Sequence, residues 1–183
     1  WLANHTNKKS NIFIFYAGHG APDLESKGTY LVPTDIDPNY ATTGYALEEL
    51  YRNLGSIKAK SITIVMDACF SGGTRDSQPL LADARPIYIE TKTGNVSKNT
   101  IVFTAASGNE ISSAYKQKKH GIFTYFFLKG LNGNADSNGD KNITVKEMSN
   151  YLSEKVPKQA RKMGREQNPQ LIGSDKNRIL LAY

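Results

Sequence analysis

A histidine and a cysteine are the residues of this sequence best suited to covalent chemistry. His19 lies in a Gly-His-Gly sequence, and Cys69, the one cysteine of the chain, is soon followed by two glycines. A thiol beside an imidazole is a nucleophile with its base, because the imidazole takes the thiol proton and returns it to the leaving group. The backbone N–H groups of Gly20 and Cys69 could then form an oxyanion hole. The alternatives are a buried structural cysteine and a histidine that merely occupies a turn.

Each of these two residues follows a short apolar run that predicts a buried strand. Residues 11–17 precede His19, and residues 61–66 precede Cys69. Continuous apolar runs of this length are typical of strands covered on both faces. An amphipathic helix predicted at 44–54 lies between them and allows a right-handed crossover. If the two strands are parallel neighbours, their carboxyl ends lie at the same edge of the sheet and bring His19 and Cys69 side by side. This edge is where ligands bind in open parallel sheets.

The remaining pattern predicts one α/β domain, residues 1–183, with a mostly parallel sheet. Its other elements are a weaker strand at 29–33, a buried strand at 100–105, helices at 121–131 and 145–156, and a last strand at 178–182. Residues 72–99 are polar and predict a long loop. Loops of this length in a compact domain are usually functional or disordered.

Composition excludes several classes of protein. Hydrophobic residues make up 39% and charged residues 22%, as in globular chains. One cysteine excludes an internal disulfide and favours a cytoplasmic location, and no apolar run is long enough to span a membrane. The net charge of +6 arises in residues 100–183, which hold thirteen basic and seven acidic residues. The basic segment 155–165 lacks aromatic residues and nucleic-acid-binding motifs, so we expect a solvated connecting segment and no nucleic-acid partner.

The two motifs resemble those of the caspase and metacaspase clan of cysteine peptidases. Residues 16–20 read Tyr-Ala-Gly-His-Gly, similar to the clan's Tyr-Ser-Gly-His-Gly. Residues 67–72 read Asp-Ala-Cys-Phe-Ser-Gly, similar to the metacaspase Asp-Ser-Cys-His-Ser-Gly. The 50 residues between His19 and Cys69 match the spacing in caspases.

The resemblance extends along nearly the whole chain, with a Gly-x-Phe-Thr helix start at 121–124 and a Gln-x-Pro segment at 167–171. It implies a caspase-like three-layer sandwich, in which helices flank a mostly parallel sheet. The clan's fold places two strands and a helix ahead of the histidine strand. We therefore expect these N-terminal strands to be missing from this chain and to be supplied in cis or by a second chain. The resemblance also favours a monomer that acts on a protein or peptide substrate.

The resemblance further implies an endopeptidase in which Cys69 is the nucleophile and His19 the base. Asp67 stands two residues before the cysteine, where caspases carry glutamine, and Ala17 stands where many metacaspases have a pocket-lining serine. A carboxylate at the base of the P1 pocket would select Arg or Lys. The alternative role for Asp67 is to cap local backbone. Two other functions stay open: a non-catalytic scaffold or regulatory module of the same fold, and a peptidase that cuts after acidic residues.

Residues 73–99 form a candidate activation loop. They follow the nucleophile directly, in the region where the resembling families are processed. Four basic residues in the loop match the preference expected of the enzyme itself: Arg75, Arg85, Lys92 and Lys98. The loop therefore predicts self-cleavage, with an ordinary surface loop as the alternative.

Residues 136–147 fit the pattern of an EF-hand calcium loop, inserted before a predicted helix. The residues at ligand positions are Asp136, Asn138, Asp140, Asn142, Thr144 and Glu147. Lys141 stands where the EF-hand has its turn-forming glycine, and Thr144 with Glu147 also fits a capping box for the following helix. By resemblance, Asp76 is a second candidate calcium ligand. Ca²⁺ is the only cofactor that these patterns predict.

Overall fold

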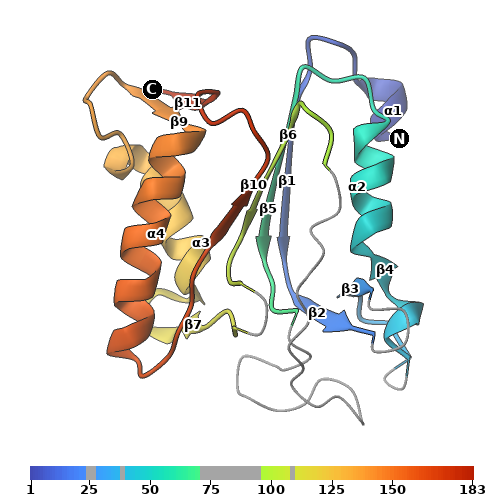
Figure 1. Cartoon of the computed structure of the whole chain (residues 1–183), viewed down its shortest axis with the longest axis horizontal. Coiled ribbons are helices and arrows are strands. Elements are labelled where there is room, and N and C mark those ends of the chain that lie inside the picture. The colour runs from blue at the N-terminus through green and yellow to red at the C-terminus, as the bar shows by residue number, and fades with distance from the viewer. Residues whose placement is uncertain (24–27, 38–39, 71–95, 108–109) are drawn as a thin grey trace.

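A central sheet lies between two layers of helix in the computed structural model, which describes residues 1–23, 28–37, 40–70, 96–107 and 110–183 (Figure 1). The sheet has four strands in the order β1-β5-β6-β10. Their bounds are β1 (Asn11–Ala17), β5 (Ser61–Asp67), β6 (Thr100–Thr104) and β10 (Gln170–Ile172). The first three are parallel, and β10 runs antiparallel to β6. The predicted α/β sandwich with a mostly parallel sheet is confirmed.

Helix α2 (Leu47–Gly55) covers one face of the sheet (Figure 1). Its buried residues Tyr51 and Leu54 pack in one cluster with Ile62 and Ile64 of β5. The helix begins three residues later than the predicted start at 44, because Tyr45–Ala46 forms the short strand β4. Burial of this apolar stripe is the main source of its stability.

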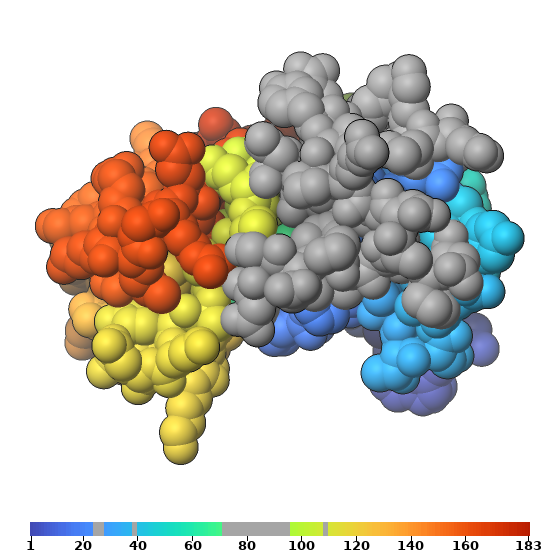
Figure 2. Space-filling model, turned by 90° about the horizontal axis from the view of Figure 1, so that it is seen from below, coloured from blue at the N-terminus to red at the C-terminus, as the bar shows by residue number. Residues whose placement is uncertain are grey.

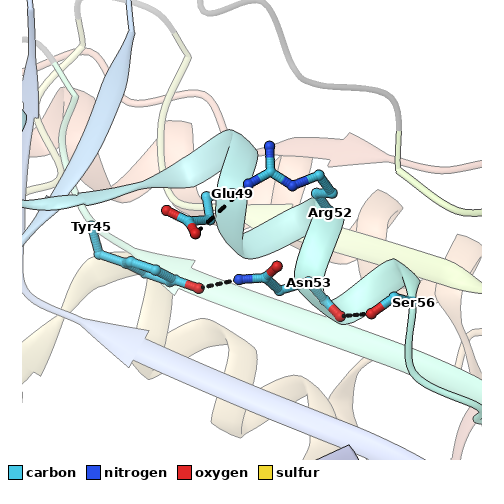
Figure 3. A network of polar contacts seen from close by, with 5 residues as sticks. All are labelled: Tyr45, Glu49, Arg52, Asn53 and Ser56. Atoms are coloured by element: carbon cyan, nitrogen blue, oxygen red, sulfur yellow. Dashed lines mark hydrogen bonds and ion pairs between the residues drawn. The ribbon is translucent and has the colours of Figure 1, made fainter.

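The exposed side of α2 carries polar contacts that contribute much less (Figure 3). Asn53 Nδ2 donates to Tyr45 Oη at 3.0 Å, and Arg52 lies 3.7 Å from the Glu49 carboxylate. Exposed ion pairs of this kind are worth about 0–1 kcal/mol. The orientation of α2 on the sheet therefore depends on its apolar face.

Helices α3 (Ile122–Lys129) and α4 (Val145–Lys162) cover the opposite face (Figure 1). Phe123 and Phe127 of α3 pack with Phe103 of β6, and α4 adds further buried residues to this cluster. Helix α4 continues six residues beyond the predicted end at 156, because Pro157 and Ala160 are buried in its last turns. The basic segment 155–165 is thus largely the end of a helix, and the expectation of a connecting segment is wrong.

Strand β1 corrects the expectation that residues 11–17 are covered on both faces. Phe13 and Phe15 on one face are 55% and 48% exposed. Among the described strands β1 has one sheet neighbour, β5, and on this face Phe13 contacts Phe127 of α3. Strands β5 and β6, with neighbours on both sides, are buried as predicted.

The end of the chain also departs from the prediction. Strand β11 (Ile179–Ala182), predicted at 178–182, pairs with β9 (Asn142–Thr144) outside the central sheet. The sheet is instead extended by β10, whose three residues are too few to give a periodic signal.

The other described elements are short. They are α1 (Leu2–His5), β2 (His19–Pro22), β3 (Thr29–Val32), β7 (Ala114–Tyr115), β8 (His120–Gly121), and the single turns η1 (Ala41–Thr43), η2 (Lys116–Lys118) and η3 (Gly130–Asn134). Strands β2, β3 and β4 form a small sheet, and β3 confirms the strand predicted at 29–33. Within the described ranges, none of the helices is long and apolar enough to cross a membrane.

A capping box begins α4, and it gives a stability prediction. Thr144 Oγ1 accepts the Glu147 N–H at 3.2 Å, and Glu147 Oε2 accepts the Thr144 N–H at 3.0 Å. Hydrogen bonding to the Thr144 backbone lowers the pKa of Glu147. A lowered pKa stabilises the fold above the unfolded-state pKa, and this contribution is lost as the pH falls through the folded-state pKa.

Thr144→Ala should therefore lower the free energy of unfolding by about 1 kcal/mol at neutral pH. The difference from the wild-type protein should shrink as the pH falls through the lowered pKa of Glu147, because protonation of the carboxylate removes the bond that the Thr144 hydroxyl donates to it at 2.8 Å. Urea unfolding above and below that pKa measures it. Ser153→Ala, at an exposed position of the same helix, is the matched control, and an equal effect of the two substitutions would contradict the prediction.

Candidate active site

The carboxyl ends of β1 and β5 lie side by side and hold the segments that carry the predicted chemistry. Ala17 is paired in register with Asp67. Beyond the strands, the Gly18 N–H donates to the Asp67 carbonyl at 3.3 Å, and the Gly20 N–H donates to the Cys69 carbonyl at 3.0 Å. These two bonds flank His19 and fix its backbone alongside residues 67–69. The prediction that the two strands are neighbours is confirmed.

His19 begins strand β2 rather than lying in a simple turn, and it is exposed. Tyr16 Oη donates to the His19 carbonyl at 2.8 Å and lies 3.4 Å from the Val32 carbonyl. Burial raises the pKa of Tyr16, so its hydroxyl remains a donor at neutral pH. The imidazole is thus carried by a backbone bonded on both sides, while its ring is accessible to solvent.

Cys69 is 5% exposed and lies two residues beyond β5. Its Sγ accepts the backbone N–H of Ser112 at 2.7 Å. Gly20, which is bonded to the Cys69 carbonyl, cannot carry a larger side chain here, because a Cβ at this position would clash with the Phe70 ring. The Gly20 N–H, predicted as an oxyanion donor, is bonded here to the Cys69 carbonyl.

Asp67 is fully buried at the end of β5. One carboxylate oxygen accepts the Ser112 hydroxyl, and the other accepts the hydroxyl of Thr124 and its N–H, the latter at 3.3 Å. Thr124 lies in the first turn of α3, where the helix dipole also stabilises the negative charge of Asp67. Asp67 therefore caps α3 through Thr124, 57 residues away in the sequence, rather than the local backbone considered from the sequence.

Gly121 makes room for this carboxylate, because a Cβ at that position would collide with Asp67 Oδ2. Gly121 is the N-cap of α3, and the predicted helix start at 121–124 is confirmed to within one residue. The small residue is thus explained by the buried acid at the end of β5. Substituting it would displace Asp67 or the helix.

Ser112 and Gln167 are site residues that the sequence did not reveal. Ser112 contacts both Cys69 and Asp67. Gln167 is fully buried, and its amide accepts the Ser113 N–H at 2.9 Å and donates to the Ala105 carbonyl at 3.0 Å. Gln167 thereby fixes the segment that touches the cysteine to the end of β6. The Gln-x-Pro motif was a signal for Gln167, whereas nothing in the sequence marks Ser112.

The candidate calcium loop at 136–147 is described by the structure. Asp76, the separate second candidate ligand, lies outside the described residues. Lys141 has φ +64°, the left-handed conformation that favours glycine in this position of an EF-hand. Its N–H donates to Asp136 Oδ2 at 3.0 Å, and the Tyr183 hydroxyl donates to the same oxygen at 2.9 Å. Glu147 is engaged in the capping box described above.

The carboxylates of this loop are thus satisfied by internal donors. The part of the chain that the structure describes contains no group of three or more His, Cys, Asp or Glu side chains suited to a metal ion. The donor set does not fit Ca²⁺ as arranged. The capping box, the competing explanation from the sequence, is confirmed.

Comparison with known proteins supports the same identification. The family model of the caspase domain matches residues 1–179, a range that contains every site residue named above. No curated protein matches this sequence. The family match and the α/β architecture agree with the motifs around His19 and Cys69. The chain therefore belongs to the caspase-domain family of cysteine peptidases.

Proposed function

We propose that this protein is a metacaspase-like cysteine endopeptidase that cleaves peptide bonds after Arg or Lys. The observation that carries the proposal is the pair of backbone bonds from Gly18 to Asp67 and from Gly20 to Cys69. They hold the backbone of His19 alongside residues 67–69, the segment that carries the one cysteine of the chain. Asp67, the first residue of that segment, has a buried carboxylate.

In the proposed reaction, the His19 imidazole takes the proton of the Cys69 thiol. The thiolate attacks the carbonyl carbon of the scissile bond and forms a tetrahedral intermediate. Collapse of that intermediate breaks the C–N bond, and His19 gives its proton to the leaving amine. Water, deprotonated by His19, then attacks the thioester, and the acid product leaves as Cys69 regains its proton.

The oxyanion of each intermediate needs N–H donors aimed at it. The Cys69 and Gly20 N–H groups are the candidates, because each lies just beyond one of the two adjoining strand ends. Gly20 would exchange its bond to the Cys69 carbonyl for one to the oxyanion. This exchange conserves the number of hydrogen bonds and lets the donor serve only once substrate is bound.

Asp67 supports the preference for a basic P1 residue. A buried carboxylate forms its strongest contacts with a guanidinium or ammonium group, which can replace neutral hydroxyl donors. Here those donors belong to Ser112 and Thr124. Ser112 would withdraw from the carboxylate as the P1 side chain enters, and Ala17, exposed opposite Asp67, leaves space at the entrance.

Three finer properties complete the proposal. The loop at 73–99, of which residues 73–95 lie outside the described range, is a proposed site of self-cleavage after Arg or Lys. Calcium, bound after a rearrangement of the loop at 136–147, is a proposed activator. The enzyme is proposed to act as a monomer on protein substrates.

A panel of fluorogenic peptides with Arg, Lys, Asp or Leu at P1 tests the proposal. We expect hydrolysis of the Arg and Lys peptides with kcat/KM at least about 100-fold above that of the Asp and Leu peptides. Repeating the assay with EDTA and with added Ca²⁺ tests the metal. Preferential cleavage after Asp would replace the proposed specificity, and no cleavage of any peptide would support the scaffold alternative instead.

A further inference from the structure

The peptide unit that joins His19 to Gly20 is hydrogen-bonded at both of its ends. Its carbonyl accepts the Tyr16 hydroxyl at 2.8 Å, and its N–H donates to the Cys69 carbonyl at 3.0 Å. The unit is trans and planar, so its C=O and its N–H point in opposite directions from one rigid plane. This N–H is one of the two donors proposed above for the oxyanion. Its direction is therefore tied to the bond at the carbonyl end.

This peptide unit lies where the chain passes from the central sheet to the small sheet. Strand β1 ends at Ala17 and β2 begins at His19, so Gly18 is the single residue between them. In Figure 1, β2 leaves the lower end of β1, and the view from below shows the small sheet at this end in blue to light blue (Figure 2). The direction of the unit thus depends on how the small sheet is attached to β1.

Tyr16 makes such an attachment. Its backbone belongs to the central sheet, where it is paired with Met66 of β5. Its hydroxyl reaches the small sheet, where His19 of β2 and Val32 of β3 are paired in register. The hydroxyl oxygen lies 2.8 Å from the His19 carbonyl and 3.4 Å from the Val32 carbonyl. A hydroxyl donates one proton, so the shorter contact is the stronger bond.

The aromatic ring of Tyr16 is held in place by packing. A Cβ at Gly18 would lie 2.7 Å from the Tyr16 hydroxyl oxygen and 2.8 Å from Cζ, so the ring occupies the space beside this glycine. The ring also packs against the apolar cluster that includes Leu31 of β3 and Met66 of β5. A phenylalanine ring would make the same contacts. Tyr16→Phe therefore removes the hydrogen bond and keeps the packing.

We infer that Tyr16 is a positioning residue whose hydroxyl aims the Gly20 N–H at the oxyanion. The inference rests on the proposed peptidase function. A hydrogen bond accepted by a carbonyl also polarises the N–H of the same peptide unit, so the Tyr16 bond strengthens this donor as well as orienting it. When the Gly20 N–H exchanges the Cys69 carbonyl for the oxyanion, the bond from Tyr16 stays and holds the plane.

Steady-state kinetics of Tyr16→Phe on an Arg-P1 peptide test this role. Loss of a whole oxyanion donor lowers kcat by about 10²–10³-fold, and this variant keeps the donor but loosens it, so we expect a fall of about tenfold. KM should change by less than about twofold, because the bound substrate carries no oxyanion before the reaction. Tyr45→Phe is the matched control. Tyr45 belongs to the same small sheet, but its hydroxyl bonds to Asn53 of α2, and its loss should leave kcat and KM unchanged (Figure 3).

Alkylation of Cys69 separates the oxyanion donor from the thiol and its base. The thiolate sulfur bonds the CH₂ carbon of iodoacetamide and iodide leaves with the electron pair, so no oxyanion forms. Tyr16→Phe should be alkylated at the wild-type rate at every pH tested. A fall in the alkylation rate that equals the fall in kcat would overturn the inference, because the effect would then lie in the thiol and the imidazole. So would a fall in kcat that Tyr45→Phe shares.

NMR tests the hydrogen bond itself and needs no catalytic activity. The sequence holds two His-Gly dipeptides, at 19–20 and 120–121. Labelling histidine carbonyls with ¹³C and glycine nitrogens with ¹⁵N therefore gives two linked signals, one from each dipeptide. Tyr16→Phe should move the His19 carbonyl signal upfield and speed hydrogen exchange at the Gly20 N–H. The signal of the second dipeptide should stay in place, which shows that the variant is folded.

The NMR result also distinguishes failure of this inference from failure of the peptidase function. An unchanged His19 carbonyl signal in Tyr16→Phe would overturn the inference, whatever the activity. Signals that move as expected in a protein that cleaves no peptide would refute the proposed function and still support the bond from Tyr16 as the contact that orients this peptide unit.

Discussion

Cys69→Ala and His19→Ala should each lower kcat/KM for an Arg-P1 peptide by roughly 10⁴-fold, and the double variant should be no worse than the single ones. Removal of the thiol removes the nucleophile, and removal of the imidazole leaves the thiol without its base. Groups that act as one unit lose their joint contribution when either is removed. Steady-state kinetics on the three variants measures the effect.

His5→Ala is the matched histidine control, because His5 lies in α1 and bonds only locally, to the Trp1 carbonyl at 2.8 Å. It should leave kcat/KM within a factor of about two. The same proteins test self-processing: after prolonged incubation, the wild-type chain should yield fragments and the Cys69→Ala chain should stay intact. Identical migration of the two would count against self-cleavage, and additive losses in the double variant would count against a dyad.

Asp67→Asn should lower kcat/KM for Arg and Lys peptides by about 100-fold while leaving that for a Leu peptide nearly unchanged. The amide keeps the size of the carboxylate and one oxygen acceptor, so the bond from Ser112 or from Thr124 can persist. The charge that would attract a basic P1 side chain is lost. The comparison of P1 residues on one variant therefore isolates recognition from folding.

Asp175→Asn, at an exposed position near the C-terminal end, removes the same charge without touching the site. It should leave the P1 preference intact. The outcome against the prediction is an equal fall on Arg, Lys and Leu peptides by Asp67→Asn. Asp67 would then matter only as the cap of α3, through the Thr124 N–H.

The adjacency of the segments that carry His19 and Cys69 could be predicted from the sequence because two local signals met one general rule of topology. Apolar runs at 11–17 and 61–66 indicated strands, and parallel strands place their carboxyl ends together. The pairing of Ala17 with Asp67 shows that the two strands end level with each other. Long, strongly apolar elements such as β5 are recognised because packing and local preference agree.

The surroundings of the pair could not be predicted in the same way. Ser112 contacts Cys69 across 43 residues of sequence, and a small polar side chain leaves no periodic trace. The Gln-x-Pro motif marks Gln167, but nothing in the sequence indicates its bond to Ser113, 54 residues away. The exposure of Phe13 and Phe15 follows from which strands flank β1, a property of the whole sheet. Likewise, α4 runs past Pro157 because tertiary burial outweighs the helix-breaking tendency of proline.

Ser112 links two events that are usually considered separately. Its N–H is bonded to the sulfur of Cys69 and its hydroxyl to the carboxylate of Asp67. A ligand at Asp67 that displaces the Ser112 backbone, and not its hydroxyl alone, also favours release of the sulfur. Thermodynamic reciprocity then requires that a group bound at the sulfur favours opening at Asp67 by the same factor. Recognition of the P1 side chain and exposure of the nucleophile would then be one equilibrium, so a peptide without the right P1 residue would meet a cysteine that is still covered.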